Sequence, residues 1–347
     1  MAVKIFPSPL RYPGGKLKVA NYVKSLFMLN GLMDGDYAEP YAGGCSVALS
    51  LLFGKYASRI FINDKDPDVY AFWHSVLNET KALIELIDTA EVTIEAWREM
   101  RLFFDNREEN HTLLQRGFAA FYMNRTNRSG ILEGGVIGGQ EQDGDWKVNA
   151  RFNRKELIQR IKKIANHRGR IFLSNMDAQD FLAKVVPTMR KKSLIYLDPP
   201  YYKKGQGLYP NAYGPEEHEA VAHDVAKLTI PWLVSYDNTP EIIELYEDYQ
   251  AIEYNLYHSA ANHVATEDSP VESEVEVITD TDDAEETAEI ESTNNVLEEP
   301  VPRIKIPKPR RKGKEIMFFS PGLKTPEDVT DPSAFNSKLL HQLHFAF

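Results

Sequence analysis

Short apolar runs alternate with longer helical patterns through the first 256 residues of the chain. Five runs are apolar at both parities and end in polar or turn-forming residues, as strands covered on both faces do. They lie at residues 37–40, 59–62, 170–173, 193–197 and 231–235. The helical patterns lie at residues 46–53, 67–77, 155–164, 216–228 and 240–246. This alternation predicts an α/β fold in which crossover helices join the strands of a parallel sheet.

One interval is too long for a single crossover. Roughly ninety residues, 79–168, separate the second predicted strand from the third, and compact connections are much shorter. The first part of this interval looks helical, and residues 124–151 are rich in glycine, asparagine and arginine. We therefore expect an inserted domain at 79–168, between a first core part at 1–78 and a second at 169–261.

The charge of the chain is unevenly distributed. Its formal net charge is −11, which by itself argues against a nucleic-acid partner. However, residues 262–302 contain fourteen acidic residues and no lysine or arginine, and the rest of the chain carries +3. Seven basic residues follow within 303–314. We expect the acidic insertion, 262–302, to be disordered or loosely ordered, followed by a basic run with a final strand at 303–320 and a tail at 321–347.

Composition limits the class of protein. The single cysteine, Cys45, excludes an intrachain disulfide framework, and no apolar run approaches the roughly 20 residues of a membrane-spanning helix. The first ten residues contain no apolar block of signal-peptide length. The sequence predicts an intracellular protein.

The strand at 193–197 delivers a carboxylate, Asp198, followed by Pro199, Pro200 and Tyr201. Ligands bind at the carboxyl ends of strands in open α/β sheets. A carboxylate and a backbone carbonyl that accept the two hydrogens of an amine on a heteroaromatic ring would activate the amine nitrogen toward an electrophile. Tyr201 would stack on the ring that carries this amine. The alternative is an ordinary turn at the end of a strand.

A glycine pair follows the first predicted strand, in the segment Glu-Pro-Tyr-Ala-Gly-Gly-Cys-Ser at 39–46. Glycines allow close approach of a ligand to the backbone. About twenty residues later, Asp64 follows the second strand, where an acidic side chain can bind the two ribose hydroxyls of a nucleoside. Alternatively, Asp64 or Asp66 caps the helix that begins near Pro67.

A third motif lies near the start of the chain. The segment Arg-Tyr-Pro-Gly-Gly-Lys at 11–16 precedes an amphipathic stretch at 17–29. Pro-Gly-Gly is typical of a turn. Lys16 at the start of a helix is unfavourable unless it binds a ligand or a carboxylate.

These motifs, in this order, closely resemble those of the adenine-specific DNA methyltransferases of the Dam type, which carry the Asp-Pro-Pro-Tyr signature. The resemblance covers nearly the whole chain to Leu256 and resumes at 313–320 as the family's last strand. It implies a Rossmann-like, seven-stranded, S-adenosylmethionine-dependent methyltransferase sheet with an inserted helical and hairpin DNA-recognition domain.

The resemblance also implies roles for individual residues. Catalysis would fall on Asp198, Pro199, Pro200 and Tyr201. Cofactor contacts would come from Tyr12, Lys16, Glu39, Tyr41, Gly43, Gly44, Asp64, Asp177 and Asp198. DNA contacts would come from Asn124, Arg125, Asn127, Arg128, Lys147 and Arg151.

Two departures from the family pattern stand out. Cys45 occupies a position where the family usually has a third small residue, and the acidic insertion interrupts what is normally a short connection. We expect Cys45 to alter cofactor affinity slightly. The acidic insertion would regulate DNA binding by competing with phosphates or by covering the basic run, a hypothesis that rests on charge alone.

The expected reaction is methyl transfer from S-adenosylmethionine to N6 of an adenine flipped out of double-stranded DNA. N4-cytosine methylation, methylation of RNA or protein, and a non-catalytic DNA-binding or DNA-mimic relic are the alternatives, although intact Asp198 and Asp64 oppose the last. We expect no metal and no membrane partner, and a monomer in the cytoplasm of a bacterial or phage-infected cell.

Overall fold

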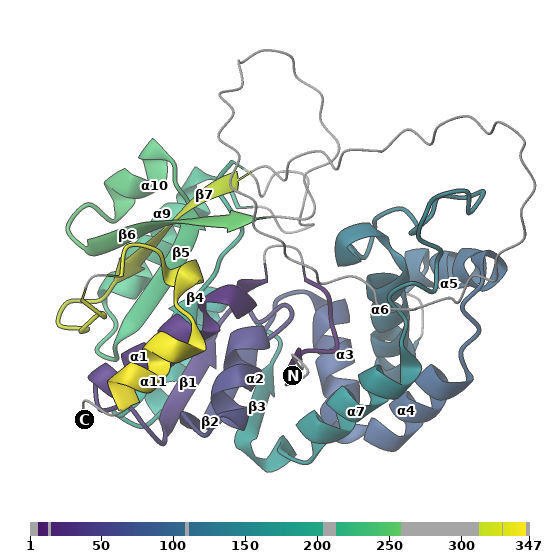
Figure 1. Ribbon diagram of the computed structural model, residues 1–347, viewed down its shortest axis with the longest axis horizontal. Coiled ribbons are helices and arrows are strands. Elements are labelled where there is room, and N and C mark those ends of the chain that lie inside the picture. The colour runs from purple at the N-terminus through teal and green to yellow at the C-terminus, as the bar shows by residue number, and fades with distance from the viewer. Residues whose placement is uncertain are drawn as a thin grey trace, which may run out of the picture. The chain divides into compact units, whose positions relative to one another are not determined.

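The computed structural model describes residues 6–12, 15–107, 111–203, 213–257, 312–327 and 329–344. Its centre is a seven-stranded sheet in the order β3-β2-β1-β4-β5-β7-β6 (Figure 1). The pairs from β3 to β5 are parallel, and β7 is antiparallel to both of its neighbours. The strands are β1 (Gly35–Glu39), β2 (Ala57–Asn63), β3 (Ile171–Ser174), β4 (Ser193–Leu197), β5 (Trp232–Asp237), β6 (Gln250–Tyr257) and β7 (Lys312–Phe319).

The five strands predicted from apolar runs are confirmed, as is the final strand that the resemblance implied. The β6 strand at 250–257 was not predicted, because its charged and polar residues break the apolar pattern. The predicted helix at 46–53 is α2 (Ser46–Phe53), and the stretch at 17–29 forms a short 3-10 helix, η1 (Lys16–Val19), followed by α1 (Ala20–Leu29). The other predicted helices are α3 (Pro67–Asn78), α7 (Arg154–Ala165), α9 (Pro215–Ala226) and α10 (Pro240–Leu245). The structure also contains α8 (Ala178–Lys184), which was not predicted.

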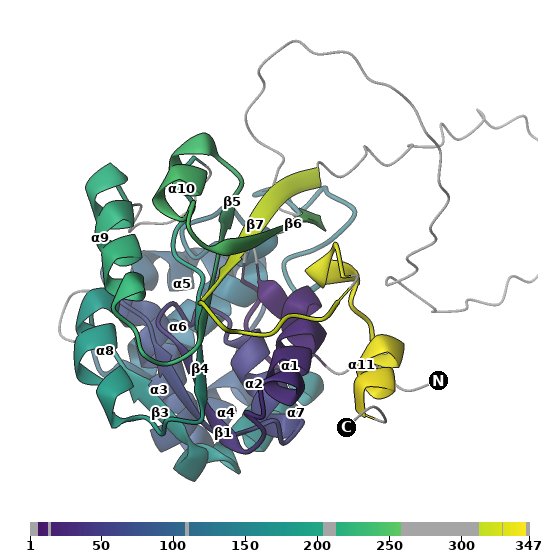
Figure 2. The same cartoon turned by 90° about the vertical axis from the view of Figure 1, so that its left-hand side faces the viewer.

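Alternate residues of the strands face two separate hydrophobic clusters. On β4, Leu194 and Tyr196 belong to the cluster formed with α1, α2 and α3, whereas Ile195 and Leu197 belong to the cluster formed with α8, α9 and α10. Figure 2 shows α8 and α9 on one side of the sheet and α1 and α2 on the other. This three-layer packing explains why the central strands are apolar at both parities.

The inserted region is helical. It contains α4 (Thr80–Thr89), α5 (Ile94–Asp105), α6 (Leu113–Thr126) and α7, and α6 packs along α3 of the core (Figure 1). Thr112 begins α6 with a capping box, and Asn153 caps α7. Among the described residues of 124–151, the only β pairing is an isolated bridge between Asn127 and Val136, so this segment is a bridged loop rather than a regular hairpin.

The chain ends in η5 (Pro332–Ala334) and α11 (Ser337–His344), which packs beside α1. Phe335, between them, is buried and contacts Tyr22 of α1 edge to face. The tail predicted at 321–347 therefore docks on the core over its described part. The acidic insertion at 262–302 and the basic residues at 303–311 lie outside the described residues.

Candidate active site

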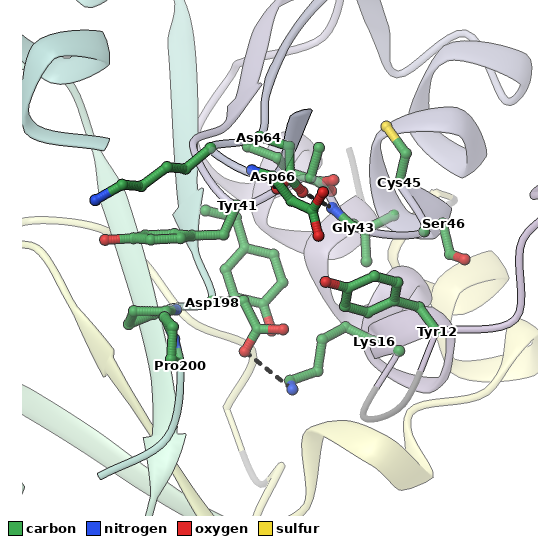
Figure 3. A pocket seen from close by; sticks show the side chains of 18 of the residues that line it. Tyr12, Lys16, Tyr41, Gly43, Cys45, Ser46, Asp64, Asp66, Asp198 and Pro200 are labelled. Atoms are coloured by element: carbon green, nitrogen blue, oxygen red, sulfur yellow. Dashed lines mark hydrogen bonds and ion pairs between the residues drawn. The ribbon is translucent and has the colours of Figure 1, made fainter. Parts of the chain in front are cut away.

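A pocket opens at the carboxyl ends of β1, β2 and β4 (Figure 3). It collects most of the catalytic and cofactor residues that the sequence indicated, although these lie up to 189 positions apart. They are Tyr12, Lys16, Glu39, Tyr41, Gly43, Gly44, Asp64, Asp198, Pro199, Pro200 and Tyr201. The sheet order brings them together, because β4 lies directly beside β1 in space.

The glycine loop gives one wall of the pocket. Gly43 has φ +43°, and a Cβ there would lie 2.7 Å from the Tyr12 ring, so only glycine allows this ring to pack on the loop. Trp73 of α3 donates an indole hydrogen bond to the Gly43 carbonyl at 3.0 Å. Cys45 adopts the left-handed conformation, φ 55°, immediately before α2. That conformation explains why a glycine would be favoured at position 45.

Asp64 lies at one end of the pocket, facing this loop (Figure 3). Its Oδ2 accepts the Gly43 N–H at 2.8 Å, and its Oδ1 accepts the Asp66 N–H at 3.0 Å. Asp66, not Asp64, caps α3, by accepting from the backbone of Asp68 and Val69. Burial raises the pKa of Asp64 to about 7, against the effect of the Gly43 hydrogen bond.

Glu39, at the end of β1, is a second acidic residue of the pocket. Its Oε1 accepts hydrogen bonds from the Tyr37 hydroxyl at 3.0 Å and from the Ala48 N–H at 2.9 Å. Burial raises the pKa of Glu39 to about 8. Two carboxyl groups of this pocket therefore titrate near neutral pH.

Asp198 and Lys16 form an ion pair at the other end of the pocket. Lys16 Nζ lies 2.9 Å from Asp198 Oδ1 and donates to the Tyr201 hydroxyl at 2.6 Å. Ser235 of β5 donates to the same Oδ1 at 3.1 Å. The Asp198 side chain keeps 27% of its surface exposed. Burial raises the pKa of Asp198, and the Lys16 charge opposes that shift.

The backbone after Asp198 is held by a residue that the sequence analysis missed. Pro199 and Pro200 have no N–H to bind, and the next two donors, Tyr202 N and Lys203 N, bind Asp237 Oδ1 and Oδ2 at 2.9 and 3.0 Å. Asp237 ends β5 and is 2% exposed. An acidic residue at the end of a predicted strand, the same signal that marked Asp64 and Asp198, indicates this position.

Asp177 differs from the other predicted cofactor residues, because it does not line the pocket. It caps α8 by accepting from the Gln179 N–H and forms an ion pair with Lys65 at 2.9 Å. Lys65 does line the pocket. Asp177 is therefore linked to the pocket through Lys65 and does not line it itself.

The predicted DNA-contacting residues fall into two groups. Asn124 and Asn127 are 1% and 0% exposed and bind other parts of the protein. Asn124 exchanges hydrogen bonds with the Arg11 backbone at 2.8 and 2.6 Å and donates to the Gly130 carbonyl. Asn127 Oδ1 accepts from Trp97 Nε1, and Asn127 Nδ2 donates to the loop carbonyls of residues 131 and 132.

The basic residues of this region differ in how far they are exposed. Arg125 is 8% exposed and donates to the Arg151 carbonyl at 2.6 Å, and burial together with the neighbouring Arg11 and Arg160 charges lowers its pKa to about 9. Arg128 and Lys147 are exposed, and Arg151 is half-buried with its guanidinium over the Trp146 ring. These last three side chains have surface to offer to a ligand.

No helix within the described ranges is long and apolar enough to cross a membrane. Nor does the described part of the chain contain a cluster of three or more histidine, cysteine or acidic side chains suited to a metal ion.

The sequence profile of a family described as D12 class N6 adenine-specific DNA methyltransferase matches residues 12–260. This range contains the glycine loop, Asp64, the helical insert and Asp198. No curated protein matches the chain significantly.

Proposed function

Because the chain belongs to the D12 class N6 adenine-specific DNA methyltransferase family and is therefore an enzyme that methylates adenine N6 in DNA, we propose that the pocket beside β1 and β4 is its active site. The observation that carries this proposal is the Lys16–Asp198 ion pair, which lies in the same pocket as the glycine loop and Asp64. One end of the pocket then suits a nucleoside, and the other suits the amine of a base.

We propose S-adenosylmethionine as the methyl donor. When bound, it supplies a methyl group on an electrophilic sulfonium. The residues present fit such a ligand. Asp64 lies where a carboxylate would accept both ribose hydroxyls, and the Gly43 backbone leaves no Cβ between the loop and the pocket. The rings of Tyr12 and Tyr41 provide flat walls of the pocket. Asp177 would contribute to cofactor binding indirectly, by holding the pocket residue Lys65 in place.

We propose that Asp198 acts on the target adenine through its second oxygen. Oδ1 is occupied by Lys16 and Ser235, and within the described residues no hydrogen bond or ion pair involves Oδ2. Oδ2 and a backbone carbonyl of Pro199 or Pro200 would accept the two N6 hydrogens. The nitrogen lone pair would then form the bond to the methyl carbon as the carbon–sulfur bond breaks toward sulfur, and Asp198 would accept the proton that N6 loses.

The adenine must leave the helix to reach this pocket, at a cost of a few kcal/mol. Tyr201 would offset part of this cost by stacking, at about 1–3 kcal/mol per base. Its hydroxyl is already fixed by Lys16. The inserted region at 79–168 would position the DNA, with contacts from Arg128, Lys147 and Arg151 and with Asn124, Arg125 and Asn127 as its internal supports.

The test uses the Asp198→Ala variant, labelled S-adenosylmethionine and unmethylated duplex DNA. The wild-type protein is expected to label adenine N6, and the variant is expected to lose at least about 10²-fold in transfer rate, because the acceptor of the N6 hydrogens is gone. The loss in transfer rate should exceed any loss in cofactor affinity, because Asp198 is also one of the predicted cofactor contacts. Asp180→Asn, an exposed change on α8, is the matched control. Wild-type activity in the Asp198 variant, or label on cytosine, would contradict the proposal.

We also propose that the protein acts as a monomer in the cytoplasm. A single copy of the chain supplies all the pocket residues named above, so a partner subunit is not needed to complete this site.

A further inference from the structure

A further buried carboxylate, Glu315 of β7, lies beside the pocket, next to Lys16. It is 0% exposed. In the sheet register it pairs with Asp237 of β5 on one side and with Tyr254 of β6 on the other. Met317 and Phe319, two and four residues later, belong to the cluster that α1 and α2 cover. Because strand side chains alternate, Glu315 faces this same side of the sheet.

The contacts of Glu315 lead directly to the proposed catalytic residues. Its Oε2 accepts a hydrogen bond from the Tyr254 hydroxyl at 2.9 Å and lies 3.7 Å from Lys16 Nζ. The same ammonium lies 2.9 Å from Asp198 Oδ1. Lys16 is therefore held between two carboxylates. Its side chain is only 5% exposed, so water screens these charges weakly.

This arrangement affects how well Asp198 can accept hydrogens. A lysine paired with Asp198 alone would neutralise it and make it a weak acceptor. A second negative charge on the far side of the lysine offsets part of that effect. The titratable groups that act on Asp198 come from several elements: Lys16 of η1, Glu39 of β1, Tyr196 of β4, Tyr201 of the loop after β4, Tyr254 of β6 and Glu315 of β7. On β5, Ser235 donates to Asp198, and Asp237 is the cross-strand neighbour of Glu315.

We propose that Glu315 is a positioning residue for the methyl transfer, which holds Lys16 between two carboxylates and so keeps Asp198 a strong acceptor for the hydrogens of the adenine amine. This role rests on the function proposed above for the pocket. Glu315 does not touch the substrate. In this role its charge would stay beside Lys16, 3.7 Å from Nζ, while Asp198 takes the proton from N6.

The test is the pH profile of single-turnover methyl transfer to duplex DNA. Glu315→Gln keeps the side-chain shape and an acceptor for Tyr254 but removes the charge. Asp198 then loses its proton at lower pH, so the acid limb is expected to move down by about one pH unit. The plateau rate is expected to fall about tenfold, because a weaker base accepts the proton. Affinity for S-adenosylmethionine and the melting temperature should remain close to those of the wild type.

Two further variants make the result decisive. Glu253→Gln removes an exposed carboxylate on β6, one residue from Tyr254, and should leave the profile unchanged. Glu315→Asp keeps the charge but draws it back from Lys16, so its acid limb should lie between those of the wild type and Glu315→Gln. If Glu315→Gln fails to fold, the position of the acid limb in Glu315→Asp alone tests the role of Glu315.

A profile of Glu315→Gln that superimposes on the wild-type profile would overturn the role of Glu315. So would an aspartate variant with no shift, or a loss confined to stability and binding with an unmoved acid limb. A wild-type protein that transfers no methyl group to adenine would instead overturn the proposed function of the pocket.

Discussion

Among single residues, Asp64 offers a direct test of the proposed cofactor site. Burial raises its pKa to about 7, and ribose hydroxyls bind the ionised carboxylate best. Affinity for S-adenosylmethionine should therefore increase as the pH rises from 6 to 8. Asp64→Asn is expected to weaken S-adenosylmethionine binding at pH 8 about tenfold or more. It should also abolish the increase in affinity that the ionisation of Asp64 causes. Calorimetric titration across this pH range measures both effects.

Glu39 provides the comparison for this experiment, because its pKa is raised to about 8 in the same pocket. Glu39→Gln should retain the step near pH 7 that Asp64→Asn loses. Equal pH dependence in the wild type and in Asp64→Asn would contradict the assignment of Asp64 to the ribose.

Most of the candidate pocket could be predicted from the sequence because its residues end strands or form turns, where chemistry is concentrated. Asp198, Asp64 and the glycine loop carry such local signals. Glu315 does not, since it lies within a strand and its partners, Lys16 and Tyr254, are distant in sequence. Nor does residue type show which way a side chain points, which is why Asn124 and Asn127 were assigned to DNA although they face inward.

At the scale of elements, α6 and the loop after it contain two kinds of residue: those that support the fold and those proposed to contact DNA. Asn124→Ala is expected to lower the free energy of unfolding by about 2 kcal/mol, because the Arg11 backbone and the Gly130 carbonyl lose their partner. Arg128→Ala loses one hydrogen bond, from Nε to the Val136 carbonyl, so it should lower stability less than Asn124→Ala and reduce the salt slope of DNA binding by about one. Urea unfolding and DNA binding at several salt concentrations measure the two effects.

Substitutions of exposed residues serve as controls for these two variants. Asn149→Ala is the control for Asn124→Ala, and Lys81→Ala is the control for Arg128→Ala. A stable Asn124→Ala protein with a reduced salt slope would show that this asparagine contacts DNA after all. The opposite result for Arg128 would place its side chain in the scaffold.

The sequence predicted elements well where a single local pattern sets them, as for β4 and α2. It failed where tertiary context decides. The β6 strand is held by its register with β7, across a gap of fifty-four residues, and no local apolar pattern marks it. The bridged loop after α6 is fixed by side-chain bonds to backbone carbonyls, a feature that composition alone does not reveal.

For the whole molecule, the distribution of charge predicts how DNA binding responds to salt. Without residues 262–302 the chain carries +3 instead of −11. Deleting this acidic insertion is expected to tighten DNA binding and to steepen its salt dependence, because the seven basic residues within 303–314 no longer have an acidic competitor. The shorter connection from β6 to β7 should also stabilise the fold by about 1 kcal/mol.

A full-length variant with the fourteen acidic residues changed to their amides separates charge from length. It should reproduce the DNA-binding change without the gain in stability. Unchanged salt dependence in both proteins would show that the acidic insertion does not compete for the DNA phosphates.

Cys45 is the one thiol in the chain, and it is buried at the start of α2. Burial raises the pKa of this thiol well above its usual range, so little of the reactive thiolate forms near neutral pH. A cysteine introduced at an exposed position of α4, such as residue 81, would consequently be the preferred target for a maleimide dye. The enzyme is thus already suited to fluorescence studies that follow a single labelled position as DNA arrives and departs.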